Sequence, residues 1–521
     1  MSEVDVDSLL KWLRDYANTR IDFRLQDERR CIQPHVVLDL GRRGILGGMR
    51  VPAAYGGLDL PMTQALRIIE QLGAIDLTLA SWVGQNIWLG VQPIVDAGTH
   101  AHHEEFLPAL ASGRMLASFA LTERVAGSEP NGIQTSLTET GDGGFRLRGD
   151  KAWIGNASWA GVVNVFAKQF DREGRLLGFT GCIVRSGTPG FEAGPELLTM
   201  GLRASVRNRI SFRDVDVPRS DILGEPLTGF SIMHRAMQGA RIVIGAATLG
   251  AMRRCLMLQH RYSTRRRIAR GHLVDYPTIV ATINEGIARA ESIACLVKKV
   301  AVLEESLPAG AIPDQVYMCI KIMSSEFLWH IADNTVQMLG ARGYTENNEV
   351  PRFARDARVF RVFEGPTETL EYFMGSVDNR KLFNFLSQHI GAAEVVKRID
   401  AAVTKVRGHK EYFDKLLHGD SQHLGRSLIG NLLCWGTLLA FVDSAAGPGC
   451  SKVMRMTRDW IDLQFEAVLA AAVGKKWPPL LACNIQEIGE LLGSNEITRV
   501  EPHSIDEVRE IEPELREENV P

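Results

Sequence analysis

RDARVFRVFEGPTE, residues 355–368, is the most informative stretch of this 521-residue chain. An Arg-Asp pair opens it, and Phe363, Glu364 and Gly365 stand near its end. A glutamate between an apolar residue and a glycine can enter a partly dry pocket, with a ligand close to the backbone. Burial would raise its pKa toward that of a useful general base. Such a glutamate is also a common turn residue, so the rest of the chain must decide between the two interpretations.

The chain around this stretch changes its pattern twice. From residue 6 to about 113, apolar residues recur at helical spacing, as in the segment from Leu66 to Leu72. From about 115 to 223 the pattern is of short β-rich runs bounded by Gly, Pro, Asn or Asp. After Gly229 the helical spacing returns and persists. Helices, then strands, then helices in separate blocks predict an α+β fold without alternating βαβ units.

We therefore expect five regions along the chain. They are an N-terminal helical domain (1–113), a middle β-domain (114–225), a C-terminal helical bundle (226–381), an extra helical region (382–492) and an acidic tail (493–521). The strands expected in the β-domain cover 146–149, 162–170, 178–184 and 209–217, and the main helices of the bundle cover 241–266, 277–304 and 316–339. The tail is poor in aromatic residues, a composition typical of disorder.

Composition excludes several classes of function. The net charge of −3 argues against a nucleic-acid binder with a broadly basic surface. The acidic N-terminus is unlike a signal peptide, and we expect no membrane-spanning segment. The eight cysteines form no Cys-x-x-Cys pair, so we expect neither a disulfide framework nor a metal site. A reducing cytoplasm is the expected location.

Four further segments could bind a ligand. Residues 119–129 (FALTERVAGSE) offer small residues, free N–H groups and hydroxyls that suit a phosphate or a ring edge, or they form a simple β-turn loop. Lys151–Asn156 (KAWIGN) could set Trp153 against a planar cofactor, or Trp153 is a core aromatic. The arginines at 261, 265, 266, 267 and 270 suit a pyrophosphate, or form a solvated helix face. Residues 337–344 (QMLGARGY) fit a helix end that could also contact a cofactor.

Taken in order, these pieces resemble the acyl-CoA dehydrogenase family over about the first 380 residues. Residues 51–57 (VPAAYGG) are similar to the family's Val-Pro-Glu-x-Tyr-Gly-Gly. Residues 121–129 resemble its Thr-Glu-Pro-Gly-Ala-Gly-Ser-Asp segment, and 151–156 its Lys-x-Trp-Ile-Thr-Asn. The pieces GLRAS (201–205), VP (217–218), LG (223–224), RDA (355–357) and FEG (363–365) complete the series.

The resemblance implies a flavoenzyme with FAD between the β-domain and the helical bundle. It implies that Glu364 is the catalytic base and that Ser128, Gln238, Arg241 and Gly365 contact the substrate. It assigns Arg266 and residues 337–341 to the cofactor of a neighbouring subunit, and so implies a homodimer or homotetramer. The implied cofactor contacts are Phe119, Leu121, Thr122, Gly127, Ser128, Trp153, Ile154, Gly155, Arg266, Gln337, Gly340, Ala341, Pro366, Thr367 and Glu368.

The reaction implied is α,β-dehydrogenation of an acyl thioester to a trans-2-enoyl thioester. The substrate would be an acyl-CoA or an acyl-carrier-protein thioester, and the electron acceptor a flavoprotein or oxygen. Some relatives carry the base on the helix just before the residue that matches Arg241; this chain has Ala240 there, which leaves Glu364. Decarboxylating relatives use an arginine in the region matching residues 75–95, which here contains no Arg or Lys, so simple desaturation is expected.

Several residues depart from the family's pattern. Arg124-Val125 stands for Pro-Gly, Gly155 for the Thr or Ser that contacts flavin N5, and Gln238 for an aspartate that helps to hold CoA. Ala269-Arg270 stands for the Phe-Gly that meets the neighbour's adenine. These departures keep two alternatives open: an acyl-thioester oxidase or other specialised flavoenzyme on the same fold, and a non-catalytic assembly or scaffold homologue.

The extension beyond Asn379 is placed like that of the family's very-long-chain branch. Such an extension can cover the surface where two dimers would otherwise meet, which favours a dimer. Its apolar faces could also contact a membrane or a carrier protein, although packing within the chain is the simpler expectation.

Overall fold

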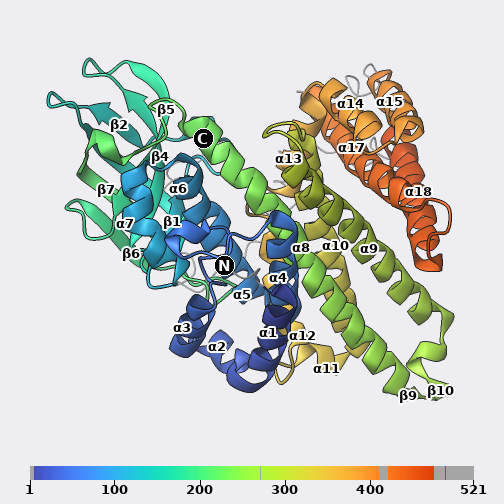
Figure 1. Cartoon of the computed structure of the whole chain (residues 1–521). Helices are drawn as coiled ribbons and strands as arrows, with labels where there is room; N and C mark the ends of the chain where they lie inside the picture. Colours follow the sequence, from blue (N-terminus) through green and yellow to red (C-terminus); the bar gives the residue numbers. More distant parts are fainter. Residues whose placement is uncertain (1–4, 270, 410–420, 475–486, 488–521) are drawn as a thin grey trace.

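The computed structural model describes residues 5–269, 271–409, 421–474 and 487. A helical region and a β-sheet domain lie on one side of a long central helix, and most of the remaining helices lie on its other side (Figure 1). The order of these regions confirms the predicted α+β architecture. The predicted tail, 493–521, lies outside the described residues.

The N-terminal region is helical, and its helices begin at residues that cap them. Asp5, Asp76 and Thr99 each accept a hydrogen bond from the backbone N–H three residues later, which satisfies an otherwise unpaired donor. Between α5 and α6 the chain forms a π-helical turn, η2 (Gln85–Val91). The helices are α1 (Val6–Arg20), α2 (Phe23–Arg29), α3 (Pro34–Arg42), α4 (Met62–Ile75), α5 (Leu77–Gly84), α6 (Gln92–Ala97) and α7 (His100–Ala111).

The middle region is one eight-stranded sheet with the order β6-β7-β3-β2-β4-β5-β8, and β1 pairs in parallel with β4. The strands predicted from the sequence are confirmed as β3, β4, β5 and β7, whereas β2, β6 and β8 were not predicted. The strands are β1 (Ala117–Ala120), β2 (Ser136–Glu139), β3 (Phe145–Gly155), β4 (Val162–Phe170), β5 (Leu176–Arg185), β6 (Phe191–Glu196), β7 (Arg207–Val217) and β8 (Ile222–Leu223).

The C-terminal bundle is built on α8, a helix of 37 residues. Small residues let α4 approach it closely: a Cβ at Gly250 would lie 1.9 Å from the carbonyl oxygen of Glu70. A short hairpin, β9 (Arg267–Ile268) and β10 (Gly271–His272), follows α8. The helices are α8 (Gly229–Arg265), α9 (Pro277–Ser306), α10 (Asp314–Leu339), α11 (Ala341–Tyr344), α12 (Val350–Phe360) and α13 (Thr367–Ser376).

The described part of the extension packs against the bundle as four helices: α14 (Arg380–Gln388), α15 (Ala393–Arg407), α17 (Ser421–Ala445) and α18 (Lys452–Val473). The apolar residues Leu438, Leu439 and Phe441 of α17 are all buried. The Trp435 ring meets Trp460 of α18, with centroids 5.9 Å apart. The extension therefore shares one hydrophobic core with the bundle.

Two helices, α8 and α17, are long and apolar enough to cross a membrane by length and composition alone. In both, most of the apolar window is buried within the protein, 78% in α8 and 67% in α17. Burial among other helices accounts for their composition, because a helix in the centre of a large core is apolar on every side.

Candidate active site

Glu364 lies in the turn between α12 and α13. Its backbone adopts φ of 56° and that of Gly365 adopts 99°. A positive φ strains a residue that has a side chain, so the surrounding structure must hold it. Lys321 of α10 does so, because its ammonium donates a hydrogen bond to the carbonyl oxygen of Gly365. Gly365 is required here for space as well, since a Cβ would lie 2.7 Å from the side chain of Leu370.

Three cationic side chains from three elements surround Glu364. They are Arg241 of α8, Lys321 of α10 and Arg207 of β7. Burial raises the pKa of Glu364 above its ordinary value, and the positive charges of these three residues oppose that rise. Burial also lowers the pKa of Lys321 to about 8 and that of Arg207 to about 10. A carboxylate whose pKa is raised accepts a proton more readily than an ordinary carboxylate.

The backbone N–H of Glu364 is available to a ligand. Among the described residues it donates no hydrogen bond, whereas the preceding N–H, of Phe363, donates to the Val359 carbonyl. The neighbouring helix offers no second base, since Ala240 is buried just before Arg241. The turn thus presents one carboxylate and one free backbone donor side by side.

On the β-domain side, a buried ion pair fixes the segment that follows β1. Lys151 donates to Glu123 and to the carbonyl oxygen of Leu121, both at 2.8 Å. Glu123 also accepts from the backbone N–H groups of Gln134 and Thr135. Within the segment 121–128, Gly127 and Ser128 are exposed and Thr122 is half-buried. Its polar groups are therefore held in place and reachable by a ligand.

Trp153, Ile154 and Gly155 face in different directions at the end of β3. Trp153 has φ of 56° and a 44% exposed side chain, whereas Ile154 is buried in the sheet's core. The side chain of Ile154 is thus not presented to a cofactor, and only its backbone could be. Gly155 is buried and pairs with Arg207 across the β3–β7 register. Since Arg207 also approaches Glu364, the end of β3 and the turn 361–366 belong to one site.

Other predicted residues surround this site with partners of their own. Phe119 packs against Phe166, with ring centroids 4.9 Å apart. The hydroxyl of Thr367 donates to Glu326 at 2.7 Å, Pro366 precedes it half-buried, and Glu368 is exposed. Gln238 donates to Asp314 at 2.5 Å, so its amide is engaged within the protein.

A second group of predicted residues lies away from the site. Arg266 ends α8, about 37 Å along the helix axis from Arg241. Gln337, Gly340 and Ala341 are exposed near the end of α10. Within a single chain these residues do not lie near Glu364. Their assignment to the cofactor of a neighbouring subunit remains a prediction. Arg270, of the same predicted arginine cluster, lies outside the described residues.

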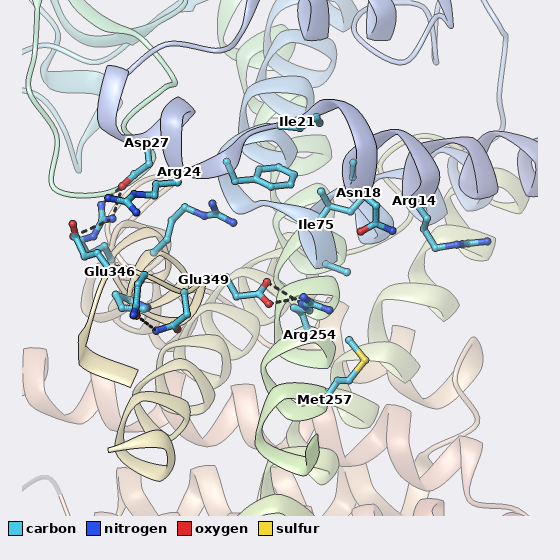
Figure 2. A pocket seen from close by; sticks show the side chains of 18 of the residues that line it. Arg14, Asn18, Ile21, Arg24, Asp27, Ile75, Arg254, Met257, Glu346 and Glu349 are labelled. Carbon is cyan, nitrogen blue, oxygen red and sulfur yellow. Dashed lines mark hydrogen bonds and ion pairs between the residues drawn. The ribbon is translucent and has the colours of Figure 1, made fainter. Parts of the chain in front are cut away.

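A cavity of about 740 Å³ opens elsewhere, between the N-terminal helices and the 346–355 segment (Figure 2). Its charged side chains pair across it: Arg254 with Glu349 and Arg355 with Asp27, both as close as 2.5 Å. None of the predicted site residues lines it. Among the described residues, no group of three or more His, Cys, Asp or Glu could hold a metal ion.

Sequence reasoning missed Lys321, Arg207 and Gln85. Lys321 is a fully buried lysine on α10, among core residues that are mostly apolar or small. A lysine within an apolar helical pattern is a signal that the sequence does contain. Arg207 and Gln85 could not be found in this way, because only the folded sheet and helix bring them to residues 155 and 364.

Comparison with known proteins identifies the family. The chain matches the acyl-CoA dehydrogenase N-terminal domain over residues 5–114, the middle domain over 118–215 and the C-terminal domain over 228–375. These matches cover more than half of the chain, which therefore belongs to the acyl-CoA dehydrogenase family. Membership agrees with the predicted class of enzyme, an oxidoreductase acting on CH–CH groups, and with the predicted cofactor, FAD.

Individual relatives agree. The very long-chain specific acyl-CoA dehydrogenase of Macaca fascicularis is 32% identical over 344 residues, which are 64% of this chain and 52% of that protein. The chain thus spans about half the length of that relative. Butyryl-CoA dehydrogenase from Megasphaera elsdenii superposes with a TM-score of 0.66 at 29% identity, over 71% of this chain and 97% of that one. An acyl-CoA dehydrogenase from Bacillus anthracis, complexed with FAD, has a TM-score of 0.74 at 22% identity and covers 99% of this chain and 95% of its own. That match shows the fold of the extension as well.

The residues at the site fit a flat aromatic cofactor. Trp153 exposes its indole at the end of β3, and the half-buried amide of Gln85 fills the side-chain position of Gly155 beside it. The fixed segment 121–128 lies on the neighbouring part of the sheet, because the N–H of Ala152 donates to the carbonyl oxygen of Thr122. A planar ring can pack against such a surface while polar groups contact its edge.

Proposed function

We propose that this chain dehydrogenates an acyl thioester between its α- and β-carbons, with Glu364 as the base that removes the α-proton. The observation that carries the proposal is the geometry of the turn 361–366, where one carboxylate and one free backbone N–H stand beside Arg241 and Lys321. FAD, when bound, supplies the acceptor for the β-hydrogen. The product is a trans-2-enoyl thioester.

The chain's own groups account for the proton transfer. An α-hydrogen of a thioester is weakly acidic, so its removal needs both a base and stabilisation of the charge that develops on the carbonyl oxygen. The raised pKa of Glu364 makes the carboxylate a competent base, and its N–H is a fixed donor to that oxygen. The cations around Glu364 keep a useful fraction of it ionised.

The test is anaerobic bleaching of the flavin by a panel of acyl-CoA and acyl-carrier-protein thioesters. We expect bleaching by at least one thioester. Glu364→Gln should abolish it while FAD stays bound, and Glu394→Gln, an exposed carboxylate on α15, should leave it unchanged. Full bleaching by the Glu364→Gln protein would remove Glu364 as the base.

The same panel identifies the carrier and the acceptor. We propose that an acyl-CoA or an acyl-carrier-protein thioester is the substrate and that an electron-transferring flavoprotein or oxygen is the acceptor. The side-chain amide of Gln238 donates a hydrogen bond to Asp314, so it is not free to hold CoA. Carrier-protein thioesters should therefore be part of the panel. We further propose a homo-oligomer in the cytoplasm.

Two measurements separate the alternatives. Rapid oxygen consumption with release of peroxide during turnover would favour an oxidase on this fold. Purification without flavin, and no restoration by added FAD, would favour a non-catalytic assembly or scaffold homologue. The retained Glu364 and its three cations speak against the latter, since a scaffold has no use for a strained, desolvated carboxylate.

A further inference from the structure

Gln85 occupies the space that a side chain at residue 155 would need. It is the first residue of η2, the π-helical turn between α5 and α6. A Cβ at Gly155 would lie 1.9 Å from Nε2 of Gln85 and 2.3 Å from its Oε1. A residue larger than glycine at 155 and the present position of Gln85 are therefore mutually exclusive. The carboxamide stands where the side chain of residue 155 would otherwise point.

The carboxamide of Gln85 has no hydrogen-bond partner among the described residues, and the residue is half-buried. Its neighbour Asn86 differs: that amide donates to Leu46 O and accepts from Ala117 N, both at 2.9 Å. Polar groups inside proteins normally find partners. An amide with two free N–H donors, held in the site by a π-helical turn, points to a ligand.

The position opposite Gln85 is rigid. Ser118 donates to the carbonyl oxygen of Gly155 at 2.6 Å, and Gly155 pairs with Arg207 of β7. A ligand at Gly155 therefore meets a fixed backbone on one side and the free amide on the other. The exposed indole of Trp153 lies two residues away in the same strand.

We infer that the carboxamide of Gln85 hydrogen-bonds the edge of the flavin ring beside Gly155 and thereby sets the flavin's reduction potential. The inference rests on the proposed function in taking residues 153–155 as a wall of the flavin site. A neutral N–H donor interacts more strongly with the electron-rich reduced ring than with the oxidised ring. Its loss destabilises the reduced form and lowers the midpoint potential.

The first test replaces the amide by an apolar group of similar size. Gln85→Leu should keep its FAD, shift the visible absorption bands and lower the midpoint potential measured by anaerobic redox titration. Gln92→Leu is the matched control: it lies on the same helical segment, but its amide is bonded to Asp96 at 2.8 Å. It should titrate like the parent. A Gln85→Leu protein with the parent's spectrum and potential would overturn the inference.

A second test moves the polar group from residue 85 to residue 155. Gly155→Ser alone should weaken FAD binding several-fold, because the new Cβ meets the Gln85 amide. Combining Gly155→Ser with Gln85→Ala frees the space and places a hydroxyl where the amide was. We expect that pair to recover FAD affinity and a potential close to the parent's. Normal FAD binding by Gly155→Ser alone, or no recovery in the pair, would contradict the inference.

These readouts separate the inference from the proposed function. Potential and FAD affinity are measured without any thioester. If thioesters bleach the parent but Gln85→Leu has an unchanged potential, the role of Gln85 fails and the function stands. If Gln85→Leu shifts the potential but no thioester bleaches the parent, the flavin contact stands and the function fails.

Discussion

The ammonium of Lys321 donates a hydrogen bond to the carbonyl oxygen of Gly365, the residue that follows Glu364. Lys321 is fully buried, and burial lowers its pKa to about 8. Its charge thus acts on the turn in two ways: it holds the strained backbone at Glu364, and it favours the ionised form of the Glu364 carboxyl against desolvation. A buried lysine without such partners would be costly, so the pairing explains its presence.

Lys321→Met should raise the pKa of Glu364, because one of its three cationic neighbours is lost. The base is then ionised only at higher pH. We expect the acidic limb of the kcat/KM–pH profile to move upward by about one pH unit. Steady-state kinetics over the pH range measures it, with FAD content as the check on folding. Lys299→Met, at an exposed position of α9, is the control. An unmoved acidic limb would show that Lys321 serves the backbone alone.

Arg207 offers an independent test of the same electrostatics from the sheet. Its guanidinium donates to Ser205 Oγ at 2.7 Å, and burial lowers its pKa to about 10. Arg207→Gln should also move the acidic limb upward, by less than Lys321→Met because its effect on Glu364 is the smallest of the three. Arg213→Gln, exposed on the same strand, should leave the profile in place. A downward shift for Arg207→Gln would contradict the assignment.

The order of the elements was predictable from the sequence, because it depends on local pattern. Strands β3, β4, β5 and β7 carry clear β-rich runs, whereas β6 contains Gly194 and Pro195, which hide it.

The turn at Glu364 was visible as a glutamate before a glycine. Its cations were visible only in part: Arg241 was predicted, but Lys321 and Arg207 were not. They come from α10 and β7, and only the packing of these elements brings them to residue 364. The burial of the Ile154 side chain in the sheet could not be seen from the sequence, because the β3–β7 register is interrupted between Lys151 and Ile154.

Asp356 should make stability fall as the pH rises toward neutral. It is buried, and desolvation together with the nearby Asp76 raises its pKa from 3.8 to about 7. Between these values the folded chain binds more protons than the unfolded chain, so stability decreases with rising pH over about 4 to 7. The backbone N–H of Leu202 donates to the Asp356 carboxyl at 2.6 Å. Asp356→Asn keeps an oxygen that can accept this hydrogen bond and removes the group that titrates.

The measurement is Tm at a series of pH values between about 5 and 8. The parent should lose more stability across this range than Asp356→Asn does, and a residual slope is expected because the pKa of Asp76 is raised as well. Asp400→Asn, exposed on α15, should follow the parent. Parallel curves for the parent and Asp356→Asn would contradict the raised pKa.

The ion pair between Lys151 and Glu123 should be far more sensitive to losing one partner than to losing both. Both side chains are almost fully buried. Lys151→Met leaves the Glu123 charge without its counter-ion and should cost about 3–5 kcal/mol of unfolding free energy, with loss of FAD affinity as the 121–128 segment loosens. Adding Glu123→Gln removes the buried charge and should recover part of this loss. Denaturant unfolding measures both variants, and a double variant no more stable than Lys151→Met would contradict the argument.

The packing of the extension should affect the active site, because α17 packs directly on α13, the helix that follows the turn at Glu364. A Cβ at Gly430 of α17 would lie 1.7 Å from the carbonyl oxygen of Glu371 on α13. Gly430→Val must push the two helices apart and should cost at least about 1–3 kcal/mol, the range for overpacking. Moving α13 also disturbs the turn at Glu364, so the rate of flavin bleaching by the thioester should fall together with Tm. Gly447→Ala, in the loop after α17 with nothing within 4 Å of the new Cβ, is the control and should change neither. A Gly430→Val protein with a lowered Tm but unchanged bleaching would show that the extension stabilises the bundle without bearing on the base.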